Sequence, residues 1–169
     1  MDKQEILNKK LLTAAVSATK AKEIKDLLKN GAEVNCTNEW GFNPTMLASQ
    51  YNPCVVVLKA LISEGGDLTV TEPEFKSSIL HLAALGSANT KVLETLISNG
   101  VGLNKKNYLG ETPLMLAVNA NPETKIAIAL IKAGSSINER DYQGHSALDF
   151  AQSSKRTYLI QALKKAGAN

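Results

Sequence analysis

The chain has 169 residues, of which 44% are hydrophobic and 21% charged, and its formal net charge is +3. This composition is typical of a globular domain and excludes a disordered chain, and the length fits one domain. The small net charge argues against a nucleic-acid surface, and no apolar run approaches the length of a membrane span.

The N-terminal part of the chain allows two interpretations. Residues 1–8 are polar and are expected to begin a helix or to form a loose arm. Lys9 and Lys10, followed by the apolar residues 11–18, loosely resemble a secretory signal peptide, although Asp2 and Glu5 precede them. The same residues fit the first helix of a helix pair spanning residues 9–39, and we expect this arrangement in a cytoplasmic protein.

Residues 40–73 are predicted to form a second pair, with helices near residues 45–50 and 53–63. Gly41 supplies a tight turn that a residue with a Cβ atom resists. Asn43 and Pro44 open the first of these helices, as a capping side chain and a first-turn proline. Asn52 and Pro53 are interpreted in the same way at the start of the second helix.

Residues 74–106 are predicted to form the third pair, with two departures from the pattern. Lys76 occupies the position of the turn glycine, and Ser87 replaces the asparagine between the helices. The link around residues 71–75 is one residue longer than its counterparts. We expect a local bulge there and no loss of a repeat.

Residues 107–140 show the unit most clearly. Gly110 provides the turn, Thr112 and Pro113 open the first helix, Asn121 is expected to cap the second, and Gly134 ends it. Residues 141–169 complete the set. There Lys164 replaces the isoleucine or leucine that lies three residues before the closing glycine in the earlier pairs, which indicates a polar capping repeat and a complete array.

The closing glycine recurs every 33 to 35 residues, as Gly31, Gly65, Gly100, Gly134 and Gly167. A fixed period in this range marks a stacked repeat protein. The segments 78–83 (Ser-Ile-Leu-His-Leu-Ala) and 112–117 (Thr-Pro-Leu-Met-Leu-Ala) resemble the T-P-L-H-x-A signature of the ankyrin repeat. The resemblance implies an all-α solenoid of five helix-turn-helix repeats, forming a single domain over residues 1–169 and joined by projecting hairpin loops.

No enzyme is predicted. The sequence contains only two histidines, His81 and His145, and no Cys/His spacing that matches a zinc site, so we expect neither a metal nor a cofactor. His81 is at the histidine position of the T-P-L-H motif, where the ring is expected to bond to the backbone or to a neighbouring hydroxyl group. Cys36 and Cys54 are too few for a disulfide framework and are expected to be reduced.

Binding is expected at the hairpins, because the resemblance implies a protein-binding module whose hairpins and first helices form a concave face. Five of the eight aromatic residues are at or beside the predicted hairpin tips, and exposed rings are typical interface anchors. The predicted partner-binding residues are Trp40, Phe42, Tyr51, Phe75, Tyr108, Leu109, Glu111, Tyr142, Gln143 and His145.

Three alternatives remain open at this stage. The rings could instead lie on the next hairpin and stabilise the stack. The protein could bind a small molecule or nucleotide, for which Lys76 beside Phe75 is the only hint, or it could be a scaffold without a specific partner. We expect a monomer that binds a protein or peptide and neither nucleic acid nor membrane. Acidic and basic residues are mixed around the rings, so the charge of the partner is not predicted.

Overall fold

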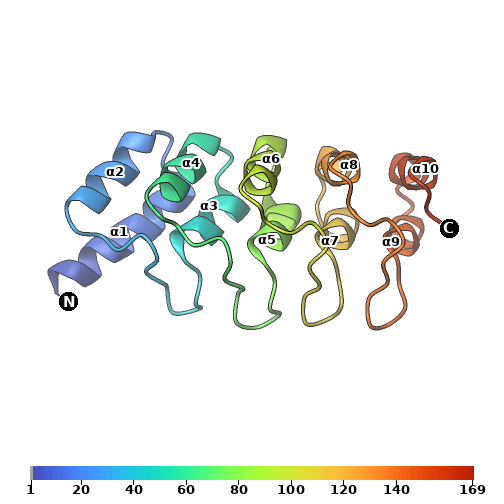
Figure 1. The fold of residues 1–169 in the computed structure, drawn as a ribbon, viewed down its shortest axis with the longest axis horizontal. Helices are drawn as coiled ribbons and strands as arrows, with labels where there is room; N and C mark the ends of the chain where they lie inside the picture. The colour runs from blue at the N-terminus through green and yellow to red at the C-terminus, as the bar shows by residue number, and fades with distance from the viewer. Residues whose placement is uncertain (1) are drawn as a thin grey trace.

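The computed structural model describes residues 2–169, and in this range it contains ten α-helices and no strand. Consecutive helices pack against each other in pairs, which stand side by side along the molecule (Figure 1). The helices are α1 Lys3–Ser17, α2 Ala21–Lys29, α3 Pro44–Tyr51, α4 Val55–Ser63, α5 Ile79–Gly86, α6 Thr90–Ser98, α7 Pro113–Asn119, α8 Thr124–Lys132, α9 Ala147–Ser153 and α10 Thr157–Lys165. The predicted all-α repeat solenoid is confirmed.

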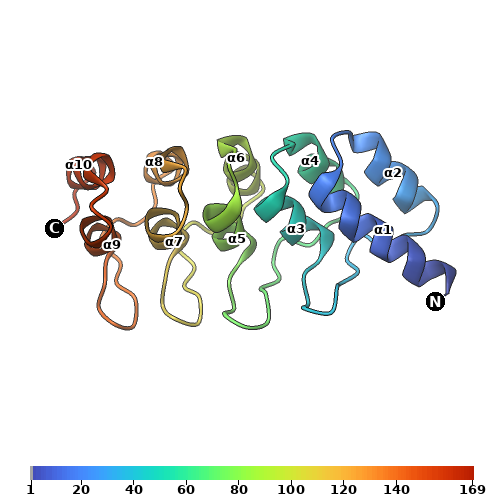
Figure 2. The same cartoon turned by 180° about the vertical axis from the view of Figure 1, so that it is seen from behind.

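The helices form two rows. The first helices of the pairs (α1, α3, α5, α7 and α9) make one row and the second helices make the other, and each helix packs against its counterpart in the next pair. Four hairpins project from the row of first helices, on the side away from the second helices, as both ribbon views show (Figures 1 and 2). The ends of the chain lie at opposite ends of the stack.

The core between the rows consists of leucine, isoleucine, valine and alanine side chains. Leu58, Leu93 and Leu130 of the second helices are at most 1% exposed, and burying each such side chain stabilises the fold by about 1.5–3 kcal/mol. Lys164 is exposed, whereas its counterpart Ile131 packs partly buried against the core. Residues 11–17 of the segment that resembles a signal peptide belong to α1, and Ala18 is the residue that caps this helix. Leu11 in the same segment is fully buried.

The closing glycines form the regular series that their spacing predicts. All five have positive φ, between 82° at Gly100 and 105° at Gly31. The N–H group of each glycine bonds to a carbonyl three residues earlier, and the next N–H bonds to one five residues earlier, as in Ala32 to Leu27 at 3.0 Å. This arrangement satisfies the last carbonyls of every second helix and reverses the chain at the same point in each pair.

Lys76, which stands at the position of the turn glycine, adopts a left-handed conformation with φ of 56°. The hairpin around it is closed by a bond from Glu72 N–H to Ser77 O at 3.0 Å. It holds one residue more than the hairpin closed from Asn38 to Phe42, and the pairs on both sides are intact. The longer link is therefore a local bulge, as expected.

The expected role of Asn52 and Asn121 as helix caps is wrong. Helices α4 and α8 begin at Val55 and Thr124, so the prolines after these asparagines lie outside the helices. The buried Nδ2 group of Asn121 donates instead to Ala84 O at 2.8 Å and to Ser87 O at 3.0 Å. These carbonyls belong to the end of α5 in the previous pair. The buried Asn52 makes the equivalent bonds to Ala15 O and Ala18 O.

In the last pair, Arg156 provides the donors for the carbonyl groups at the end of the preceding first helix. Its guanidinium group donates to Val118 O and Asn121 O, both at 2.8 Å, at the end of α7. It also donates to the Thr124 hydroxyl group at 3.1 Å. This contact was not predicted from the sequence, because an arginine in a polar segment is more often solvated.

Replacing Asn121 with alanine should lower the free energy of unfolding by about 3 kcal/mol, because two buried carbonyls lose their donor. The exposed Asn119, the last residue of α7, provides the control, and Asn119→Ala should change stability by less than about 0.5 kcal/mol. Urea unfolding followed by circular dichroism measures both. Equal stability of the two variants would contradict the assignment.

Replacing Lys76 with glycine should stabilise the protein by about 0.5–1 kcal/mol, because glycine avoids a left-handed penalty of about 1–2 kcal/mol and adds less than that in chain entropy. Lys105 is also exposed and is not among the residues with positive φ, so Lys105→Gly should not stabilise. Thermal unfolding of the two variants gives the comparison, and a destabilised Lys76→Gly variant would refute the argument.

Candidate functional site

Each hairpin tip is shaped by one polar side chain at its base. Asn38 Oδ1 accepts hydrogen bonds from the N–H groups of Trp40 and Phe42, at 3.1 and 2.9 Å. Asn107 and Asp141 accept two equivalent bonds each. In the longer hairpin a glutamate has this role: both oxygens of the buried Glu72 accept bonds from three backbone N–H groups. The longer side chain matches the extra residue.

Neighbouring hairpins are joined at their tips by backbone hydrogen bonds. Tyr108 N–H donates to Phe75 O at 2.6 Å, and Tyr142 N–H donates to Leu109 O at 3.1 Å. Pro73 occupies the corresponding position of the second hairpin and has no N–H group to donate. Its ring lies instead against Gly41, where an added Cβ atom would be 2.5 Å from Pro73 Cγ. The first two hairpins are thus held by close packing.

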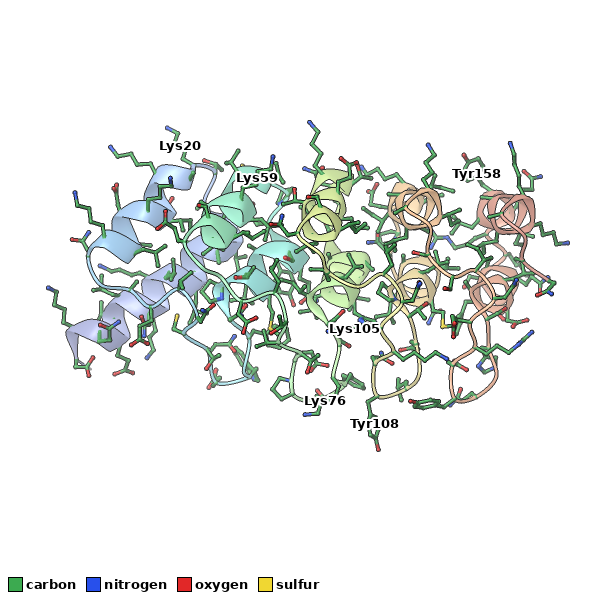
Figure 3. The ribbon with its side chains drawn as sticks, viewed as in Figure 1. Lys20, Lys59, Lys76, Lys105, Tyr108 and Tyr158 are labelled. Carbon is green, nitrogen blue, oxygen red and sulfur yellow. The ribbon has the colours of Figure 1, made fainter. Side chains whose placement is uncertain are left out.

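The aromatic side chains at the tips are exposed to solvent. The exposed fraction is 66% for Trp40, 43% for Phe75, 69% for Tyr108 and 74% for Tyr142. Figure 3 shows Tyr108 extending from the end of its hairpin, away from the helices. Part of the Tyr142 ring contacts the tip of the preceding hairpin, because a Cβ atom on Gly110 would be 2.8 Å from Tyr142 Cδ1. The alternative interpretation, in which the rings stabilise the stack, therefore holds for one side of the Tyr142 ring.

A pocket of about 670 Å³ lies between the first two hairpins, and we call it the Trp40 pocket. Its floor comes from α3 and α5, which contribute Gln50, Leu82 and Leu85. The hairpin residues that line it are Asn38, Glu39, Trp40, Gly41, Phe42, Glu72, Pro73, Glu74, Phe75 and Ser77. This pocket brings together three of the predicted residues, Trp40, Phe42 and Phe75. Trp40 and Phe75 are 35 positions apart in the sequence.

A second pocket, the Tyr142 pocket, has a volume of about 600 Å³ and lies between the last two hairpins. It is lined by Tyr108, Leu109, Glu111, Asn119, Asp141, Tyr142, Gln143 and Phe150. Five predicted residues therefore meet there, and the missed Phe150 and Asn119 come from α9 and α7. A signal for the missed residues exists, since each floor residue lies four or seven positions after a helix-opening residue.

Two predicted residues lie outside both pockets. Tyr51 is the last residue of α3 and is 55% exposed, but it lines neither pocket. The ring of His145 lies beside the Tyr142 pocket, with its centroid 5.6 Å from that of Phe150. His145 Nδ1 is 3.4 Å from Asp141 Oδ2.

The charges that line the two pockets are all negative, unlike the mixed rim that the sequence suggested. Glu39, Glu72 and Glu74 line the Trp40 pocket, and Glu111 and Asp141 line the Tyr142 pocket, with no lysine or arginine. The nearby bases are held elsewhere: Arg140 pairs with Asp149 at 3.2 Å. Lys76, at the far end of its hairpin, does not line the Trp40 pocket (Figure 3).

His81 has the structural role that its motif position predicts. Its Nδ1 atom accepts a hydrogen bond from Ser78 N–H at 3.1 Å and lies 2.8 Å from the Ser78 hydroxyl group. Its Nε2 atom is 3.0 Å from Glu111 O in the next pair. The ring is fully buried, and burial lowers its pKa below the ordinary value of 6.5. The neutral ring joins two pairs and does not reach solvent.

The two cysteines are free thiols in the structure. Burial, followed by the nearby Glu33 carboxylate, raises the pKa of Cys36 to about 11, which keeps this thiol protonated. The Cys54 thiol donates a hydrogen bond to Thr19 O at 3.2 Å. Within residues 2–169 no group of three or more His, Cys, Asp or Glu side chains is placed to hold a metal ion.

The fold and its pockets define an α-helical repeat protein that presents hairpins and first helices as one surface. A family model described as "Ankyrin repeats (3 copies)" matches residues 11–107 and 80–169. The chain belongs to the ankyrin-repeat family, whose members are generally protein–protein interaction modules. No helix in residues 2–169 combines the length and apolarity that a membrane-spanning segment needs.

The buried His81 should make stability depend on pH. Its folded-state pKa is lowered, so the unfolded chain takes up the proton first, and the free energy of unfolding should fall as the pH drops below 6.5. Methionine occupies the same position in the second and fourth pairs, so His81→Met should flatten the dependence between pH 7.5 and 5.5, a window around the ordinary histidine pKa of about 6.5.

His145→Gln provides the comparison for this experiment, because it removes the other histidine, which is exposed. Hydrogen bonds from Ser146 lower the pKa of Asp149, so this carboxylate affects stability only at lower pH. Urea midpoints at each pH give the slopes. An unchanged slope in His81→Met would show that the histidine does not carry the effect.

Proposed function

We propose that the protein is a non-enzymatic recognition module that binds a protein or peptide segment along the hairpin face. The observation that supports this proposal best is the series of exposed rings on consecutive hairpins. Trp40, Phe75, Tyr108 and Tyr142 are each at least 43% exposed, although large apolar side chains are otherwise rarely left in water in such a series. Each pair of rings borders a pocket whose floor includes apolar side chains, Leu82 and Leu85 in one pocket and Phe150 in the other.

A small-molecule or nucleotide site has less support. Phosphate recognition would need basic side chains converging on one pocket, whereas the Trp40 and Tyr142 pockets are lined by carboxylates. The Lys76 side chain, which gave the only hint of such a site, does not line the Trp40 pocket. A scaffold without a specific partner would not explain why the rings and the pockets coincide.

We also propose that the five helix pairs correspond to five ankyrin repeats, divided near residues 39, 73, 106 and 140, with the first and last acting as caps. The last pair supports this division, because its Lys164 side chain is exposed where earlier pairs pack an apolar residue. The two free thiols are compatible with a reducing compartment, and we propose that the protein acts as a monomer in the cytoplasm.

Replacing Trp40, Phe75, Tyr108 and Tyr142 together with alanine should weaken partner binding by more than about 100-fold, because interface aromatics commonly contribute 2 kcal/mol or more each. Affinity capture with mass spectrometry, comparing the wild type with the four-ring variant, identifies proteins whose capture depends on these rings. Circular dichroism of the variant should show wild-type helical content, since the rings are mostly outside the core.

Tyr158 provides the control for the four-ring variant. It is 65% exposed and lies on α10, in the row of second helices and far from the hairpins (Figure 3). Tyr158→Ala should retain every captured partner. If the four-ring variant unfolds, or if it captures the same proteins as the wild type, the rings are not the binding residues.

A further inference from the structure

We infer that the partner segment is basic and that the Trp40 pocket receives a lysine or arginine side chain. This inference rests on the proposed function and names the chemistry of the partner at the same site. It follows from the sign of the charge in the pocket, from its aromatic walls, and from an acceptor in its floor that lacks a donor.

The charge of the Trp40 pocket is opposite to that of the protein as a whole. Glu39, Glu72 and Glu74 line the pocket without any basic residue, while the chain has a net charge of +3. Glu39 and Glu74 are exposed, and neither belongs to an ion pair in the part of the chain that the structure describes. Glu39 also borders a neighbouring cavity at α1, where Lys9 is 3.2 Å from Glu5.

The walls of the Trp40 pocket suit a cation with an aliphatic stem. A lysine or arginine head group is attracted to the face of an aromatic ring, and tryptophan is the strongest such ring. The apolar stem of the same side chain would pack on Leu82 and Leu85 in the floor. A neutral apolar side chain would also fit the floor, but it would leave the two exposed carboxylates without a partner.

Gln50 gives independent support for a ligand with donors. It lines the pocket, and its Oε1 atom is buried without a hydrogen-bond partner in the described residues, so the side chain has to turn toward the pocket to accept from a ligand. Buried acceptors in native structures are nearly always paired, so this one calls for a donor. Lysine and arginine head groups are purely donors, with three and five N–H bonds.

The Tyr142 pocket extends the inference along the surface. It is also lined by acidic and aromatic residues without a base, and it lies two repeats from the Trp40 pocket. Packed helices lie about 9 Å apart, so the pockets are separated by about 18 Å. An extended chain covers this distance in about six residues. One basic segment with two cationic side chains at this spacing would reach both pockets.

Trp40 is the only tryptophan in the chain, so its fluorescence reports directly on the pocket. The probe is a glycine/serine peptide that carries two arginines six positions apart, a spacing taken from an extended chain of about 3.3 Å per residue. The matched peptide carries citrulline, which has nearly the same shape and no charge. The arginine peptide should perturb Trp40 emission saturably and bind about tenfold or more tightly than the citrulline peptide. Equal affinity would overturn the inference, as would no perturbation by the arginine peptide at millimolar concentration.

The carboxylates are tested by the double variant Glu39→Gln and Glu74→Gln, which should weaken binding of the arginine peptide about tenfold. Glu23 and Glu94 are exposed on the second helices α2 and α6, so Glu23→Gln with Glu94→Gln makes the same change in net charge elsewhere. This control should bind like the wild type. If both double variants lose affinity equally, only the overall charge matters and the pocket is not the site.

A third peptide separates failure of this inference from failure of the proposed function. It carries leucine at both positions, and its binding is compared between the wild type and the four-ring variant by isothermal titration. If the leucine peptide binds as tightly as the arginine peptide and requires the rings, the hairpin face binds peptides but is not selective for cations. If the arginine peptide binds the four-ring variant like the wild type, both proposals are wrong.

Discussion

The structure depends on how very short helices satisfy their last carbonyl groups. A helix leaves its final four carbonyl groups without intrahelical donors. In helices of seven to nine residues, these are about half of all the carbonyl groups of the helix. The second helices solve the problem locally with a glycine of positive φ. The first helices α1, α5 and α7 take donors from the next pair instead, through Asn52, Asn121 and Arg156. These bonds join the first pair to the second, the third to the fourth and the fourth to the fifth, and they help to align the hairpins.

The alignment of the hairpins creates the candidate site. Each tip is fixed by a polar side chain at its base and by contact with the tip beside it, so the backbone positions that carry the exposed rings are fixed. The pockets form only where two hairpins and two first helices meet, so their acidic character results from side chains that are distant in sequence. Glu72 has two roles, since its carboxylate shapes the longer hairpin and also contributes to the charge of the Trp40 pocket.

The sequence predicted those features that are encoded by a single residue and its neighbours. The closing glycines and the helix-opening caps are of this kind, because backbone conformation restricts residue type at each position. Asn52 and Asn121 were misinterpreted since an asparagine before a proline is also a common local cap, and their partners are 34 to 37 positions away. The pocket charge was missed for a related reason: the ion pair of Arg140 with Asp149 removes a base that the sequence placed near the rings.

The spacing of these contacts also bears on how the molecule assembles. Asn52, Asn121 and Arg156 donate to partners 32 to 39 positions away, in the adjacent pair only. Every step of growth therefore closes a loop of similar length, and none waits for a contact between distant parts of the chain. Folding can therefore begin at any well-packed pair of neighbours and spread in both directions.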